Sequence, residues 1–229
     1  MTVVFSDGAE DGTTDGFNDV YAPNGTFTAT TDEAKFGSYS FEAHLDANEG
    51  SPSWAIGYVG SLSNAYNPLY LRAYIRFDVL PEDVNDYIPL LGVWHSAVSS
   101  NNCRAGIIRD ATGYHWFIRR YDNGGFSNAL GSNTPAVDTW YCVELEVYNH
   151  NSTGYTKLYI NNVSEVESTG LNNSARNLNY AHFGVNYGVA PDLTAFNAYL
   201  DNCVVADAYI GLETSIPVLM HHYKLMRKR

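Results

Sequence analysis

Two stretches of the chain alternate apolar residues with arginine, tyrosine and glutamate, side chains able to bind a polar ligand. In LYLRAYIRF the leucine, alanine, isoleucine and phenylalanine residues alternate with Arg72, Tyr74 and Arg76. In WYCVELEVY, Glu144 and Glu146 alternate with apolar residues in the same way. Because successive side chains of a strand point to opposite faces, each stretch predicts a strand with one buried face and one polar face.

The polar faces carry groups that recognise carbohydrates. Aromatic rings stack on the CH surfaces of sugars, and arginine and glutamate form paired hydrogen bonds with carboxylates and hydroxyls. We therefore predict a glycan-binding groove. The alternative is a solvated sheet on which Arg–Glu pairs and cross-strand contacts only stabilise the fold. In HWFIRRY either register leaves one arginine beside apolar neighbours, and we assign Arg119 to the groove. The predicted groove residues are Arg72, Tyr74, Arg76, His95, Arg119, Tyr121, Glu144 and Glu146.

The same residues bear on catalysis. Retaining glycosidases hold two carboxyl groups about 5–5.5 Å apart, whereas the rise of a strand puts Glu144 and Glu146 roughly 6–7 Å apart. A polysaccharide lyase needs a cation or amide to neutralise a uronate carboxylate, and a tyrosine or histidine to move the α-proton. The sequence favours binding without catalysis, and a lyase is the alternative activity. Its candidate residues are Arg72, Arg76, His95 and either Tyr74 or Tyr121.

Composition limits the class of protein. The chain has 229 residues, is 45% hydrophobic and has a formal net charge of −12. That length fits one β domain, and so acidic a chain is a poor ligand for nucleic acid. No segment predicts membrane insertion, and MTVVFSDGAE does not resemble a signal peptide. Cys103, Cys142 and Cys203 are predicted to be buried free thiols, with one disulfide plus a free thiol as the alternative.

Period-two alternation recurs over about ten short segments, separated by turns such as APNG and DNGG. This pattern predicts an all-β fold, an antiparallel sandwich or barrel, with at most a short helical turn at residues 81–87. We expect one domain over residues 1–213 and a separate C-terminal extension over residues 214–229.

The extension differs from the body in charge. Four of the 13 basic residues and none of the 25 acidic residues lie in it, which leaves the body with a formal charge of −16. We predict an arm that docks on a neighbouring acidic subunit; the alternative is a frayed terminus. The arm residues are Tyr223, Lys224, Arg227, Lys228 and Arg229.

Six segments, taken in order, resemble the concanavalin A-like lectin/glucanase jelly rolls, in particular their laminin-G-like and polysaccharide-lyase-like branches. They are VFSDGAEDG, FGSYSFEA, LYLRAYIRF, TWYCVELEV, KLYINNVSEV and LDNCVVADAYIG. The resemblance implies an antiparallel jelly-roll β-sandwich, with its last strand beside its first and glycans bound on its concave sheet. The strand motifs of the alginate lyases of this fold are absent. Since lectins, hydrolases, lyases and structural domains share the fold, the resemblance does not select an activity.

The resemblance also implies a structural Ca²⁺ between the first and last strands. Asp201 matches the closing acid of the family, and Asp7 is the nearest candidate at the opening strand, where Ser6 replaces the family's usual glutamate. Carboxylate oxygens are suitable calcium ligands. The alternative is that Asp201 caps a turn and Asp7 is solvated.

Together these features predict a non-catalytic, lectin-like surface domain. It would bind a glycan or polysaccharide, decorate a multi-subunit assembly such as a virion or an extracellular structure, or do both, and it would lie outside the cell or on a virion surface. The alternatives are a lyase acting on an acidic glycan and a purely structural subunit.

Overall fold

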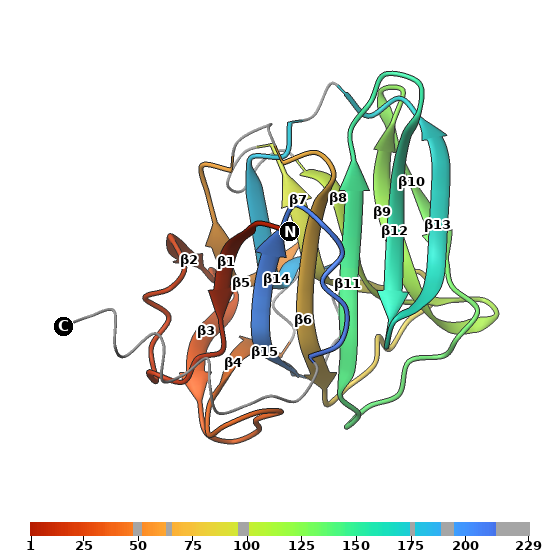
Figure 1. Cartoon of the computed structure of the whole chain (residues 1–229). Helices are drawn as coiled ribbons and strands as arrows, with labels where there is room; N and C mark the ends of the chain where they lie inside the picture. Colours follow the sequence, from red (N-terminus) through yellow and green to blue (C-terminus); the bar gives the residue numbers. More distant parts are fainter. Residues whose placement is uncertain (48–51, 63–65, 96–100, 175–176, 189–194, 214–229) are drawn as a thin grey trace.

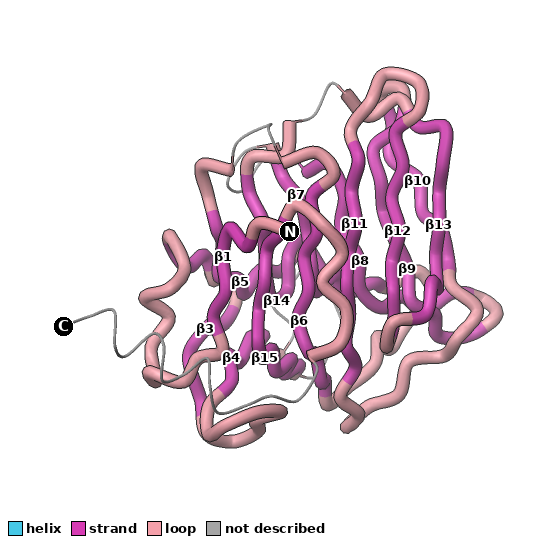
Figure 2. Tube along the Cα trace, in the orientation of Figure 1, coloured by secondary structure: helices cyan, strands magenta, loops and turns pink. Residues whose placement is uncertain are grey.

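The computed structural model describes residues 1–47, 52–62, 66–95, 101–174, 177–188 and 195–213. Two antiparallel sheets stack on one another as a sandwich (Figure 1), and the described residues contain strands, turns and loops but no helix (Figure 2). The predicted jelly-roll β-sandwich is therefore confirmed. No helix in the described part of the chain is long and apolar enough to cross a membrane.

Sheet A, in front in Figure 1, holds both the first and the last of the described strands. Across the sheet the order is β13 (Val163–Leu171), β12 (Gly154–Ile160), β11 (Tyr141–Tyr148), β6 (Leu69–Phe77), β15 (Phe196–Ala206), β4 (Ser40–Leu45) and β3 (Gly25–Thr30), and β1 (Val3–Asp7) also pairs with β15. The expectation that LDNCVVADAYIG closes the domain beside the first strand is confirmed.

Sheet B lies behind sheet A in Figure 1 and contains seven strands. Their order is β10 (Gly125–Leu130), β9 (Gly113–Asp122), β8 (Asn101–Asp110), β7 (Tyr87–Trp94), β14 (Tyr180–Gly188), β5 (Ser53–Val59) and β2 (Asp19–Tyr21).

The core fills the space between the sheets. Alternate residues of β6 and β11, such as Leu71, Ile75 and Leu145, are fully buried there. They face apolar residues of sheet B, including Ile118 and Phe183. The three cysteines are buried free thiols, as expected.

After β15 the chain continues as an extended segment, residues 207–213, which we call the strap. In Figure 1 it is the blue segment that crosses in front of β6 and β11. Asp207 fixes its start, because the Asp207 amide donates to the Thr2 carbonyl at 3.2 Å and the Asp207 carboxylate accepts from the Thr2 amide. The strap therefore covers the part of the outer face of sheet A that β6 and β11 form.

Candidate functional site

The outer face of sheet A carries five of the eight predicted groove residues. Arg72 and Glu144 are direct cross-strand partners of β6 and β11, and Tyr74 and Cys142 are the next pair along the same face. We call Arg72, Tyr74, Cys142 and Glu144 the socket. The strap lies on the socket, and Arg72 is only 2% exposed and Glu144 only 1%.

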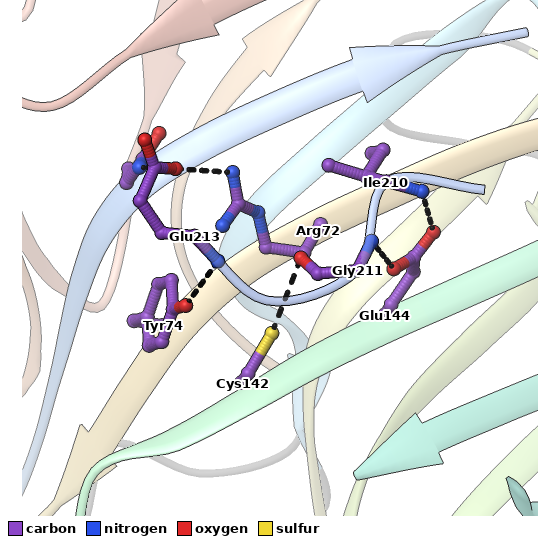
Figure 3. A network of polar contacts seen from close by, with 8 residues as sticks. Arg72, Tyr74, Cys142, Glu144, Ile210, Gly211 and Glu213 are labelled. Atoms are coloured by element: carbon purple, nitrogen blue, oxygen red, sulfur yellow. Dashed lines mark hydrogen bonds and ion pairs between the residues drawn. The ribbon is translucent and has the colours of Figure 1, made fainter. Parts of the chain in front are cut away.

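Hydrogen bonds hold the strap to the socket (Figure 3). The Glu144 carboxylate accepts from the amides of Ile210 and Gly211 at 2.7 and 2.8 Å. The Tyr74 hydroxyl accepts from the Glu213 amide at 2.7 Å, and the Glu213 carboxylate pairs with Arg72 at 3.3 Å. Burial raises the pKa of Glu144, although the two amide bonds oppose that shift.

Glu146 lies on the same face and binds three tyrosine hydroxyls. Tyr70 and Tyr155 donate to Oε1 at 2.6 and 2.8 Å, and Tyr159 donates to Oε2 at 2.9 Å. Burial and these hydrogen bonds raise the pKa of each tyrosine, so the hydroxyls remain protonated donors. Glu146 is 5% exposed, and both of its oxygens already have protein partners.

Arg76 is the remaining predicted groove residue on sheet A, and it is ion-paired. Its guanidinium lies 2.9 Å from Asp138 and 3.4 Å from Glu33. The predicted groove residues of sheet A thus contact the protein itself, as the structural alternative in the sequence analysis describes.

The other three predicted residues lie on sheet B, so the eight do not form one groove. Arg119 and Tyr121 project from β9 on the outer face, opposite the core residues Trp116 and Ile118. His95 follows β7, and its Nδ1 accepts from the Asn177 amide at 3.3 Å.

The outer face of sheet B, which we call the sheet B face, has an unbroken cross-strand row. The register places these residues side by side: Asp19, Tyr58, His182, Gly92, Arg104, Arg119 and Asn128. Neighbouring strands are about 4.8 Å apart, so His182 and Arg104 are separated by roughly 10 Å. The row places a histidine, a glycine and two arginines, one from each of four consecutive strands, on one surface.

Aromatic side chains form the floor beside this row. Trp94 stacks on His182 with ring centroids 5.1 Å apart and 14° between planes, and Trp54 lies 5.1 Å from Trp94. Gly92 makes this packing possible, because a Cβ there would lie 2.8 Å from both Trp94 Nε1 and Asn186 Oδ1. Neither of those two buried atoms has a hydrogen-bond partner among the described residues.

Arg104 and Arg119 supply positive charge to the sheet B face. Arg104 lies between two rings, 4.5 Å from the centroid of Tyr187 and 5.4 Å from that of Tyr87, and Arg119 lies 5.7 Å from Tyr87. Burial lowers the pKa of Arg104 to about 10, which leaves it charged at neutral pH. Within the described residues, neither arginine forms an ion pair.

Tyr187 occupies a β-bulge where β14 changes register against β5. Its φ is 65°, a left-handed conformation that is unfavourable for a bulky residue. The bulge directs its ring onto Arg104 and to 5.6 Å from Trp54. Tyr187 is 36% exposed, so it presents an aromatic surface to solvent directly over the arginine.

The predicted calcium ligands lie on the paired strands β1 and β15 but already accept hydrogen bonds. Asp201 Oδ2 accepts from the amides of Lys35 and Phe36 at 2.9 and 2.8 Å, and Asp7 Oδ1 accepts from the Ala9 amide at 2.9 Å. The described residues contain no cluster of three or more histidine, cysteine, aspartate or glutamate side chains able to hold a metal. The side chains alone do not form a calcium cage, and calcium binding stays a prediction.

Asp201 makes folding stability depend on pH in a way that tests this prediction. Burial raises its pKa to about 6 from 3.8, although the amide bonds oppose the shift. The folded state therefore binds the proton more tightly, and stability falls as pH rises from about 4 to above 6. Relative to Asp201→Asn, the free energy of unfolding of the unchanged protein should fall by roughly 3 kcal/mol across that range.

Denaturant unfolding of both proteins at several pH values measures this difference. A calcium ion on Asp201 would favour the ionised carboxylate, so added calcium would remove the slope and raise the melting temperature. A flat difference in the presence of a chelator would contradict the assigned pKa shift. A melting curve that calcium does not change would remove the calcium site.

Comparisons with known proteins reveal the fold but no sequence family. No protein-family model and no curated protein matches the chain. Among solved structures, an endo-β-1,4-glucuronan lyase from the fungus Trichoderma reesei is similar, with a TM-score of 0.66 and 12% identity over 90% of this chain and 95% of that one. The cellulose-induced protein Cip1 has a TM-score of 0.66 and 14% identity, over 91% of this chain and 99% of that one.

A structure of botulinum neurotoxin type C is also similar. It is described with the statement that cell entry of this toxin depends on interaction with two ganglioside molecules. Its TM-score is 0.59 and its identity 15%, over 91% of this chain and 48% of that one. The chain has the concanavalin A-like jelly-roll fold. At such low identities these likenesses establish the fold alone. Because one fold can host many functions, the evidence for a function has to come from the surface residues of this chain.

Several residues of the sheet B face were absent from the sequence prediction: Trp54, Tyr58, Arg104, His182, Asn186 and Tyr187. In SWAIGYV both faces of the strand are apolar or aromatic, so alternation does not distinguish a core face from a ligand face. In YAHFGVNYG, by contrast, His182 and Asn186 alternate with core residues and could have been recognised.

Proposed function

We propose that the protein is a glycan-binding domain of the concanavalin A-like fold and that its sheet B face binds an acidic glycan. The observation that carries the proposal is the pair Arg104 and Arg119, two adjacent cations that lie among aromatic rings without an ion pair within the described residues. A uronate or sialate carboxylate would pair with Arg119, which is half-buried, and the exposed ring of Tyr187 would stack on the sugar. Arg104 is only 3% exposed and donates to the Tyr187 carbonyl at 3.3 Å, so it would add positive charge from beneath the ring.

The similar proteins support an acidic ligand on this surface. The chain as a whole carries a net charge of −12, which repels anions, so binding of an acidic ligand would depend on the local positive charge of Arg104 and Arg119. The similar proteins include a glucuronan lyase and a toxin described with gangliosides, and both names refer to carbohydrates or to lipids that carry them.

A polysaccharide lyase is the second candidate, because His182, Tyr58 and Arg104 share one row. In β-elimination a base would remove the proton α to the uronate carboxylate, the C–O bond to the leaving sugar would break, and that oxygen would take a proton. His182 is fully buried, however, and the Tyr58 hydroxyl donates to Asp19 at 3.2 Å. The accessible chemistry therefore favours binding without catalysis.

We further propose an extracellular or virion-surface location and a role in a multi-subunit assembly. The predicted docking arm, with Tyr223, Lys224, Arg227, Lys228 and Arg229, lies outside the described residues. Its charge opposite to that of the body is the support for docking.

A polysaccharide panel tests the proposed function. Full-length protein is titrated with polyuronates, sialylated glycans and neutral glucans, and each mixture is also assayed for unsaturated products. We expect binding to acidic members that weakens with salt, and no unsaturated product. Unsaturated product would show the lyase instead, and no binding to any acidic member would refute the glycan-binding proposal.

A further inference from the structure

The strap and its socket form a binding site independent of the sheet B face. The strap lies beyond β15, the last strand, so its removal from the socket leaves every strand pair of sheet A in place. Its central contacts are backbone and side-chain groups of Ile210, Gly211 and Glu213 with socket side chains (Figure 3). It is thus bound in the manner of a peptide ligand.

The socket recognises specific chemistry. The Glu144 carboxylate accepts hydrogen bonds from two successive amides, and the Tyr74 hydroxyl accepts one from a third amide. Arg72 donates to the carboxylate of Glu213. A ligand must therefore present two adjacent N–H groups followed, two residues later, by an acidic residue. The strap sequence IGLE meets this requirement.

Arg72 is incompletely satisfied in the closed arrangement. Its Nε and Nη1 are buried and have no hydrogen-bond partner among the described residues, and only Nη2 contacts Glu213. A buried cationic donor without a partner costs free energy. The Glu213 side chain remains 39% exposed although Arg72 is buried, so another carboxylate can compete for Arg72 from the Glu213 side.

We propose that the socket is a peptide-docking site which the strap of a second copy of this protein can occupy. In a single copy the attached strap prevails, because tethering gives it an effective concentration on the order of millimolar. Exchange becomes favourable when copies are concentrated beside one another. Reciprocal exchange would place the sheet A faces of two copies together, an isologous contact.

Cys142 reports whether the strap is closed. Its sulfur lies 3.9 Å from the Gly211 carbonyl oxygen and is covered by the strap, whereas Cys103 and Cys203 are fully buried in the core. Lifting the strap from the socket would therefore expose the thiol of Cys142 and leave the other two thiols buried. Burial raises the pKa of Cys142 in the closed state, with the charge of Arg72 opposing the shift.

Two variants separate the strap from the socket. Gly211→Val disables the strap alone, because Gly211 has a φ of 74°, where a β-branched residue is strained. Glu144→Gln disables the socket alone, since its amide group turns one acceptor toward the strap into a donor. With Cys142→Ser added, the Glu144→Gln protein supplies an intact strap and no reporter thiol.

The experiment measures thiol labelling of the Gly211→Val protein by a disulfide reagent. We expect Cys142 to react about tenfold faster than in the unchanged protein, with Cys103 and Cys203 still protected. An excess of the Glu144→Gln, Cys142→Ser protein should restore protection, and light scattering of the mixture should show a heterodimer. The peptide AYIGLE should also restore protection, and AYIGLQ should not.

Three results would overturn the proposal. One is labelling of Cys142 in Gly211→Val no faster than in the unchanged protein. Another is failure of both the partner protein and AYIGLE to slow it. The third is protection by the peptide without protection by the partner protein, which would show that the strap of a second folded copy does not reach the socket.

Discussion

Replacing Arg119 with alanine is expected to weaken binding of an acidic glycan by about tenfold to a hundredfold, the usual worth of a charge-assisted hydrogen bond. Arg119 is half-buried on the sheet B face, and its Nη1 donates only to Asn128, at 3.2 Å. Its removal should leave the fold intact. Isothermal titration with the tightest polyuronate of the panel measures the loss.

Arg76→Ala is the matched control. Arg76 is also an arginine on the outer face of a sheet, but it lies on sheet A and is paired with Asp138 and Glu33. Its replacement should leave glycan affinity unchanged. If Arg76→Ala weakens binding as much as Arg119→Ala does, the ligand lies on sheet A and the assignment of the sheet B face is wrong.

Glu146→Ala should lower the free energy of unfolding by about 3–5 kcal/mol, because three buried or half-buried tyrosine hydroxyls lose their acceptor at once. Denaturant unfolding measures the change. The large effect follows from the position of Glu146, which accepts hydrogen bonds from Tyr70, Tyr155 and Tyr159. Its role is therefore to stabilise the fold and not to bind a ligand.

Tyr155→Phe removes one of the three hydrogen bonds and provides the comparison. It should cost about 1 kcal/mol and leave glycan affinity unchanged. An effect of Glu146→Ala no larger than that of Tyr155→Phe would show that the three hydroxyls are satisfied elsewhere. A selective loss of glycan binding in either variant would return Glu146 to a binding role.

The fold was predictable because the apolar residues that alternate along the sequence are the ones buried in the core. LYLRAYIRF and WYCVELEVY became β6 and β11 with the expected buried faces, and they are neighbours in sheet A. Short strands were harder: β2 has three residues, and β10 reads GFSNAL, with too few apolar residues to show a period. Their strand geometry comes from pairing with β5 and β9.

The site was less predictable, because alternation shows which residues share a face but not which sheet they join or what covers them. Arg72 and Arg119 have similar contexts, yet one lies beneath the strap and the other on the sheet B face. The strap itself, DAYIGLE, has no periodic pattern, since its conformation depends on Glu144, far away in sequence. Tyr187 is directed by a bulge that depends on the partner strand.

The central claim is that the protein binds acidic glycans, and one titration tests it most directly. Full-length protein is titrated at low salt with a polyuronate and, in parallel, with a neutral glucan of the same linkage. The account predicts binding of the polyuronate alone, with an affinity that falls as salt screens Arg104 and Arg119. Equal affinity for the two polymers, or no binding of the polyuronate, would contradict it.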